Sequence, residues 1–154
     1  MKRLLLFLIV VFCLAGCSLG EKDEEVQEQP GYSSPQLVVS GICDVGNNIV
    51  AAGGVLRDED NQALGRALMS NGDITSRMIY EGIVKIINVA GDKGELKFEP
   101  GEVLVNKNNL NAKGSINAYV NISGYVVKKE IVILMRRLPN PVTTAWYVAG
   151  IEFY

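Results

Sequence analysis

The sequence predicts an α+β domain, with N-terminal helices packed on a curved antiparallel sheet, a meander of about four strands. Two patterns along the chain carry this prediction. Apolar residues recur at helical spacing from residue 60 to residue 89, whereas beyond Gly94 they alternate with polar residues, as in strands with one face in water. Helices followed by sequentially paired strands are typical of a sheet with its helices on one face.

The N-terminus has the layout of a secretory signal. Two cations, Lys2 and Arg3, precede an uncharged apolar run from Leu4 to Gly16. As a helix, this run would span roughly 20 Å, which is short of the hydrocarbon core of about 30 Å. We therefore expect residues 1–16 to be a signal peptide rather than a membrane span.

The end of this run is more specific, because Leu14-Ala15-Gly16-Cys17 resembles the lipobox of bacterial lipoproteins. The resemblance implies a lipid on the thiol of Cys17, cleavage just before it, and further acylation such as palmitate. Two or more acyl chains anchor a protein stably. The expected location is thus the bacterial cell envelope, lipid-anchored to the extracytoplasmic side of a membrane.

Residues 17–36 read as the lipidated cysteine and a disordered tether. Between Glu21 and Glu28 the chain carries one lysine against five acids and almost nothing to bury. The remaining segment, 37–154, has the size of a single domain, with twelve Lys and Arg against twelve Asp and Glu. This balance gives no basic field, so we expect no nucleic-acid partner. The expected partners are the membrane, through Cys17, and another envelope protein.

The residue inventory limits the possible chemistry. The chain has no histidine and three cysteines, which excludes Ser-His-Asp and Cys-His catalysis and His-based metal sites. Once Cys13 leaves with the signal and Cys17 is lipidated, Cys43 is the remaining thiol. Its apolar surroundings favour a buried, inert side chain. No dinucleotide, P-loop or EF-hand motif is present, so we expect no cofactor and no metal.

The predicted elements follow in order. Residues 37–56 are compatible with a helix or a glycine-containing hairpin, and the helix is favoured. Asp60 or Asn61 is expected to cap a second helix, Asp73 a third that ends near Val89. The cluster Asp58-Glu59-Asp60 is interpreted as helix-terminal charge rather than a metal site. Strands are expected at residues 96–105, 116–122, 126–136 and 145–154, and the third should be central because residues 131–135 are apolar on both faces.

This order of elements, with "NGD" at residues 71–73 between two helices and "AWYVAGIEF" at residues 145–153 in the last strand, resembles the NTF2-like, cystatin-like superfamily. The resemblance covers about Leu37 to Tyr154 and implies a cone-shaped domain. Enzymes of that superfamily use Asp, His and Tyr in the cavity of the cone. The candidate pocket residues are aromatic, although such spacing is also typical of core or sheet surface: Tyr80, Tyr119, Tyr125 and Trp146.

Three functions remain open at this point. The first is an envelope lipoprotein with a non-catalytic binding or assembly domain, which the missing catalytic residues favour. The second is a small-molecule-binding protein or an isomerase- or dehydratase-like enzyme with an NTF2-like pocket. The third is an immunity or exclusion lipoprotein, which nothing in the sequence separates from the first. A fold alone does not decide among them.

Overall fold

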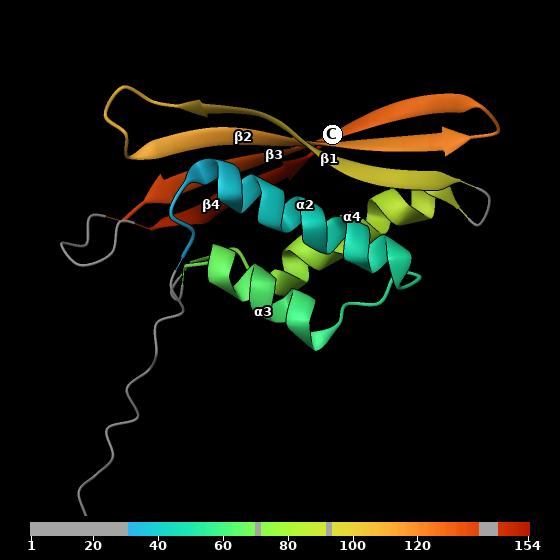
Figure 1. Cartoon of the computed structure of the whole chain (residues 1–154), viewed down its shortest axis with the longest axis horizontal. Helices are drawn as coiled ribbons and strands as arrows, with labels where there is room; N and C mark the ends of the chain where they lie inside the picture. The colour runs from blue at the N-terminus through green and yellow to red at the C-terminus, as the bar shows by residue number, and fades with distance from the viewer. Residues whose placement is uncertain (1–30, 70–71, 92–93, 139–144) are drawn as a thin grey trace, which may run out of the picture.

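The computed structural model describes residues 31–69, 72–91, 94–138 and 145–154 (Figure 1). Within these residues, three helices form one layer and four antiparallel strands form the other, which confirms the predicted α+β architecture. The signal segment, Cys17 and the tether up to residue 30 lie outside the described residues.

The segment that was compatible with helix or hairpin is a helix, α2 (Pro35–Ala51). Ser34 caps it, because its side-chain oxygen accepts a hydrogen bond from the backbone N–H of Leu37 at 3.3 Å. Glycine is needed inside this helix for close packing. A Cβ at Gly46 would lie 2.9 Å from Cδ2 of Phe98, so the sheet approaches the helix backbone directly at this point.

The folded unit begins earlier than the predicted boundary at Leu37. The backbone N–H of Trp146 donates to the carbonyl oxygen of Tyr32 at 2.8 Å, and the two residues form an isolated antiparallel bridge. Pro35 is buried. Residues 31–36 therefore belong to the domain rather than to the tether, because they complete the edge of the sheet where the last strand begins.

The second helix, α3 (Asp58–Ala67), begins before the predicted cap at Asp60 or Asn61. Its three acids occupy the first turn, where a helix N-terminus favours negative charge. Asp60 is buried, and its Oδ1 accepts a hydrogen bond from Nδ2 of Asn48 at 2.8 Å. This carboxylate therefore holds α3 against α2 instead of capping its own helix.

The third helix, α4 (Ser76–Ala90), is capped by Thr75, whose Oγ1 accepts from the N–H of Met78 at 3.3 Å. The prediction that Asp73 is the cap was wrong. A cap residue directly precedes the first helical residue, here Ser76, so that its oxygen can accept from the N–H of the second or third helical residue. Asp73 lies two positions too early for this. The first residue of the "NGD" break, Asn71, lies outside the described residues.

The strands are β1 (Glu95–Val105), β2 (Asn111–Ile122), β3 (Tyr125–Arg137) and β4 (Trp146–Phe153). They form an antiparallel meander in the order β1-β2-β3-β4, so β3 is an inner strand, as predicted. β2 begins at Asn111, within the predicted loop, because Asn106 closes a shorter turn by accepting from the N–H groups of Leu110 and Asn111.

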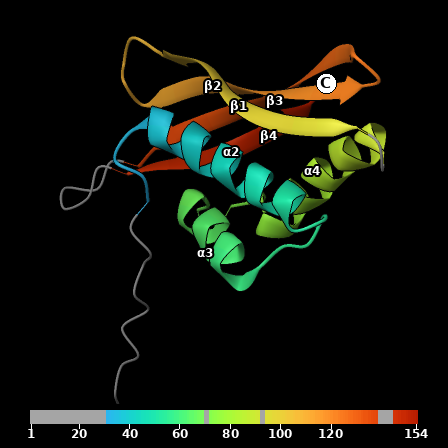
Figure 2. The ribbon, with the colours of Figure 1, turned by 45° about the vertical axis from the view of Figure 1, so that its right-hand side comes forward.

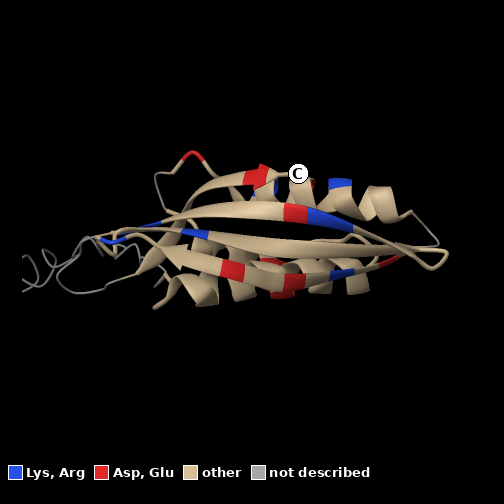
Figure 3. Cartoon of the chain, turned by 90° about the horizontal axis from the view of Figure 1, so that it is seen from above, with Lys and Arg blue, Asp and Glu red and all other residues tan. Residues whose placement is uncertain are grey.

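The two faces of the sheet differ. One packs against the helices, and its strands contribute a shared apolar core: Phe98, Ile116, Ala118, Val120, Ile131, Ile133, Met135 and Val148. No described helix covers the other face, which carries charges of both signs (Figure 3). On this face of β3, Val132 is buried but Leu134 is 39% exposed. Although residues 131–135 are apolar on both faces, the outer face of β3 is therefore covered at Val132 and open at Leu134.

Candidate functional site

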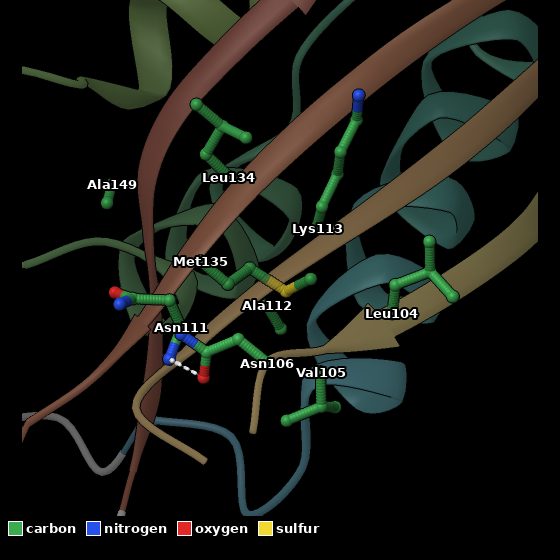
Figure 4. Close-up of a pocket in the computed structure, with 9 residues that line it drawn as sticks. All are labelled: Leu104, Val105, Asn106, Asn111, Ala112, Lys113, Leu134, Met135 and Ala149. Atoms are coloured by element: carbon green, nitrogen blue, oxygen red, sulfur yellow. Dashed lines mark hydrogen bonds between the residues drawn. The ribbon is translucent and has the colours of Figure 1, made fainter. Parts of the chain in front are cut away.

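A groove of about 470 Å³ lies at the end of the sheet nearest the start of the domain. All four strands or their connections contribute to it (Figure 4). Ligand sites in proteins commonly range from about 300 to 1,000 Å³. The lining residues are Leu104, Val105, Asn106, Asn111, Ala112, Lys113, Leu134, Met135 and Ala149.

Strand register builds the groove. Leu104 of β1 pairs with Lys113 of β2, Lys113 pairs with Leu134 of β3, and Leu134 pairs with Gly150 of β4. These four residues form one row across the outer face of the sheet. Gly150 lets the side chain of Leu134 pack over β4, since a Cβ there would lie 3.2 Å from Cδ1 of Leu134.

A β-bulge supplies the ninth lining residue. The pairing of β3 with β4 shifts between Leu134, which faces Gly150, and Met135, which faces Val148. Ala149 is therefore an extra residue on β4, and it borders the groove. Bulges often re-aim side chains beside functional sites.

The lining is mostly apolar, and Lys113 is its one ionisable residue. Of the two lining asparagines, Asn106 uses its side-chain oxygen to hold the turn, accepting from the N–H of Asn111 at 3.2 Å (Figure 4). The nine lining residues contain no carboxylate, thiol or hydroxyl that could transfer a proton. The groove is therefore suited to binding an apolar group beside a negative charge or a hydrogen-bond acceptor.

The four predicted pocket aromatics are not brought together, and none of them lines this groove. Trp146 is in the core and Tyr119 lies on the outer face of β2. Tyr80 of α4 donates its hydroxyl to the carbonyl oxygen of Gly54 at 2.8 Å. Tyr125 stands at the turn between β2 and β3 and is 79% exposed.

Cys43 is buried on α2 and forms no disulfide. Burial raises the pKa of its thiol to about 11, and the negative charge of Asp44 acts in the same direction. The side chain is therefore a neutral thiol near neutral pH, as expected of an inert core residue rather than a nucleophile.

The described parts of the chain contain neither a metal-binding cluster nor a membrane-spanning helix. No three side chains of the His, Cys, Asp or Glu type lie close enough there to hold a metal ion. Within residues 31–69, 72–91, 94–138 and 145–154, no helix combines the length and apolar content needed to cross a bilayer.

The sequence does contain one indication of the groove, in the apolar residues that interrupt the alternation of two strands. Leu104 and Leu134 are apolar residues at positions where alternation calls for a polar side chain on the wet face. Each alone is ordinary, because single exposed leucines are common on protein surfaces. The register that places both beside Lys113 turns them into a site.

Comparisons with known proteins add little to this geometry. No protein-family model matches the chain, and a search of curated proteins gave no match. Among solved structures, a variant of the NTF2-like designed protein Rd1NTF2_05 is similar, with a TM-score of 0.45 and 10% identity, covering 76% of this chain and 93% of that one. The intermembrane space region of the chloroplast protein ARC6 has a TM-score of 0.38 and 8% identity, covering 77% and 92%. The assignment to the α+β class rests on the topology of the chain itself.

Proposed function

We propose that this chain is a lipoprotein of the bacterial envelope, anchored through a lipid on Cys17, whose single domain binds a partner without catalysing a reaction. The signal-like segment that ends in Leu14-Ala15-Gly16-Cys17 supports the anchor. The open groove supports the binding role, because its lining offers apolar surface and one cation but no carboxylate, thiol or hydroxyl.

The ligand class follows from the row Leu104, Lys113 and Leu134. Two leucines flank the aliphatic stem of the lysine, and its ammonium group can reach the solvent at the rim. An apolar chain or side chain with an adjacent carboxylate would bury apolar area and place its charge near Lys113. Such a group is found in acyl chains with an acidic head and in acidic-apolar peptide segments.

The anchor is tested on the mature N-terminus. Mass spectrometry of the protein from a bacterial membrane should show an acylated cysteine as the first residue. Cys17→Ser should leave the signal uncut or release the protein in soluble form. A wild-type chain that begins at another residue would rule out the anchor.

The groove is tested with decanoate, a single apolar chain with a carboxylate, used below the micelle concentration of decanoate. The protein is a chain produced without the signal, which begins at residue 17 and carries Cys17→Ser. We expect saturable shifts of the amide signals of Lys113 and Leu134. Leu134→Glu should abolish these shifts and Lys113→Gln should weaken them, whereas Leu37→Glu, at an exposed site on α2, should leave them unchanged. Equal binding by the wild-type and Leu134→Glu chains would refute a binding role for the groove.

A further inference from the structure

The β2–β3 hairpin projects beyond its neighbours at the end of the molecule opposite the start of the domain (Figures 1 and 2). β1 begins at Glu95, opposite Asn121, and β4 ends with Phe153, opposite Ile131. Tyr154 still exchanges backbone hydrogen bonds with Glu130. The part of the hairpin that extends past both neighbours, residues 122–129, is called the hairpin tip below.

The hairpin tip is apolar on both of its faces. Tyr125 and Val127 share the face of the helix layer, because they alternate with Val126 along β3. Ile122 lies opposite Tyr125 on the same face. The exposed fractions are 79% for Tyr125 and 64% for Val126, and Ile122 and Val127 are also exposed. Exposed apolar side chains that lie next to one another, as these four do, are typical of a surface that contacts another protein or a membrane.

Two cations stand directly behind this apolar tip. Lys128 and Lys129 follow Val127 on β3, and Lys128 is exposed. Neither forms a salt bridge with a described residue. An amphipathic aromatic residue with aliphatic neighbours, backed by lysines, matches the chemistry of a membrane interface with anionic headgroups.

The turn at the end of the tip provides a hydrogen-bond partner for the N–H of Gly124. Ser123 and Gly124 adopt positive φ angles of 53° and 87°, as a tight two-residue hairpin turn requires. The N–H of Gly124 donates to Oδ1 of Asn121 at 3.1 Å. Removing this turn from bulk water therefore costs less than it would for a turn with a free N–H.

The open edge of β3 limits how deep such a tip can go. Glu130 directs its N–H and C=O towards β4, so the alternate residues Lys128 and Val126 direct theirs to the same side, beyond the end of β4. Hydrocarbon does not satisfy such groups, whereas water and headgroups at the interface do. Consecutive lysines on an open edge also oppose pairing with a second copy of the chain.

We propose that the hairpin tip inserts into the headgroup region of an anionic membrane, with Tyr125 and Val126 at the acyl boundary and Lys128 and Lys129 against the phosphates. The inference takes its setting from the proposed anchor, which would keep the domain close to a bilayer. Residues 18–30 would then link the lipid to the opposite end of the domain, so the domain would be held to the membrane at two points.

The test uses a chain produced without the signal, which begins at residue 17 and carries Cys17→Ser, so that membrane binding depends on neither lipidation nor the apolar signal. The chain is floated with vesicles of phosphatidylcholine alone or with phosphatidylglycerol added. We expect binding to the anionic vesicles, lowered roughly tenfold by Tyr125→Ser with Val126→Ser and by Lys128→Gln with Lys129→Gln. Leu37→Ser with Leu110→Ser, two exposed leucines at the other end, is the matched control and should bind like the parent chain.

Depth is read from a fluorophore on Val126→Cys in the same chain, where the buried Cys43 reacts slowly. Its emission should shift to the blue on anionic vesicles, whereas the same label on Asn108→Cys in the β1–β2 turn should not. Absence of binding, or equal binding by the tip variants and the control, would overturn the proposal. A concentration-dependent dimer that the tip substitutions dissociate, without vesicle binding, would assign the tip to self-association. Failure of the proposed anchor would appear instead as an unmodified Cys17 in the mass spectrum.

Discussion

Replacing Ile133 and Leu134 by alanine, one at a time, compares the two faces of β3 at adjacent positions. Ile133 is 0% exposed and packs under the helices, so its truncation leaves a cavity that the core cannot fill. Such changes typically cost about 2–5 kcal/mol of the free energy of unfolding. We expect about 3 kcal/mol for Ile133→Ala.

Leu134 lies on the open face, with 39% of its surface exposed. Burying a whole leucine side chain is worth about 1.5–3 kcal/mol, and alanine keeps the β-carbon, so roughly half of that range is lost. Water enters the open groove, so no sealed cavity adds to the cost. We therefore expect about 1 kcal/mol for Leu134→Ala.

Both variants can be measured by urea unfolding through the fluorescence of Trp146, the one tryptophan of the chain, which is 3% exposed. With a slope of about 1–3 kcal/mol per molar urea, the Ile133→Ala midpoint should fall by roughly 1–3 M and the Leu134→Ala midpoint by about a third as much. Equal losses in the two variants would refute the reasoning, since they would mean that the outer face is also covered.

Three further predictions concern single contacts. Asn47→Ala should lower the free energy of unfolding by about 1–3 kcal/mol. The side-chain oxygen of Asn47 accepts a hydrogen bond from the N–H of Phe98 at 2.9 Å, and its side-chain nitrogen donates one to the carbonyl oxygen of Phe98 at 3.0 Å. The control in the same urea assay is Asn88→Ala, on the exposed side of α4. Gly82→Val should lower the free energy of unfolding by about 1–3 kcal/mol and speed amide hydrogen exchange near the end of β4, because an added side chain would overlap the ring of Phe153. Unchanged exchange in that part of β4 would contradict this packing. Between about pH 9 and pH 11 the native Cys43 keeps a proton that the unfolded chain releases. The free energy of unfolding should therefore fall as pH rises through this window, and the fall should be smaller in Cys43→Ala. Native Cys43 should also react slowly with thiol reagents until urea is added.

The fold class could be predicted because it depends on local patterns that tertiary packing reinforces. The change from helical to alternating spacing after Gly94 marks the point where the helix layer ends and the sheet begins. The glycines of α2 obscured its helical character, since Gly41 admits the ring of Tyr32 and Gly46 admits that of Phe98, a contact distant in sequence. The predicted cap of α4 was wrong for a local reason. Asp and Thr are both favourable cap residues, and the backbone conformation places Thr75 rather than Asp73 directly before the first helical residue.

The groove could not be predicted from the same patterns. Leu104, Lys113 and Leu134 become neighbours through the register of two strand pairs, and one bulge adds Ala149. A shift of one residue in either pair would turn one of these side chains to the core face. The candidate aromatics do not line the groove for the related reason that residue type does not indicate which face or which end of a strand a ring occupies.

The bridge between Tyr32 and Trp146 has a mechanical consequence. It joins the first described residues of the domain to the first residue of its last strand through one backbone hydrogen bond of 2.8 Å. Any tension applied through the residues before Gly31 would therefore enter the fold at this bridge before it reached α2. A single bridge breaks under less force than a long ladder of hydrogen bonds loaded in shear. A modest pull would therefore detach residues 31–34 and add them to the tether, while the helices and the meander stayed intact.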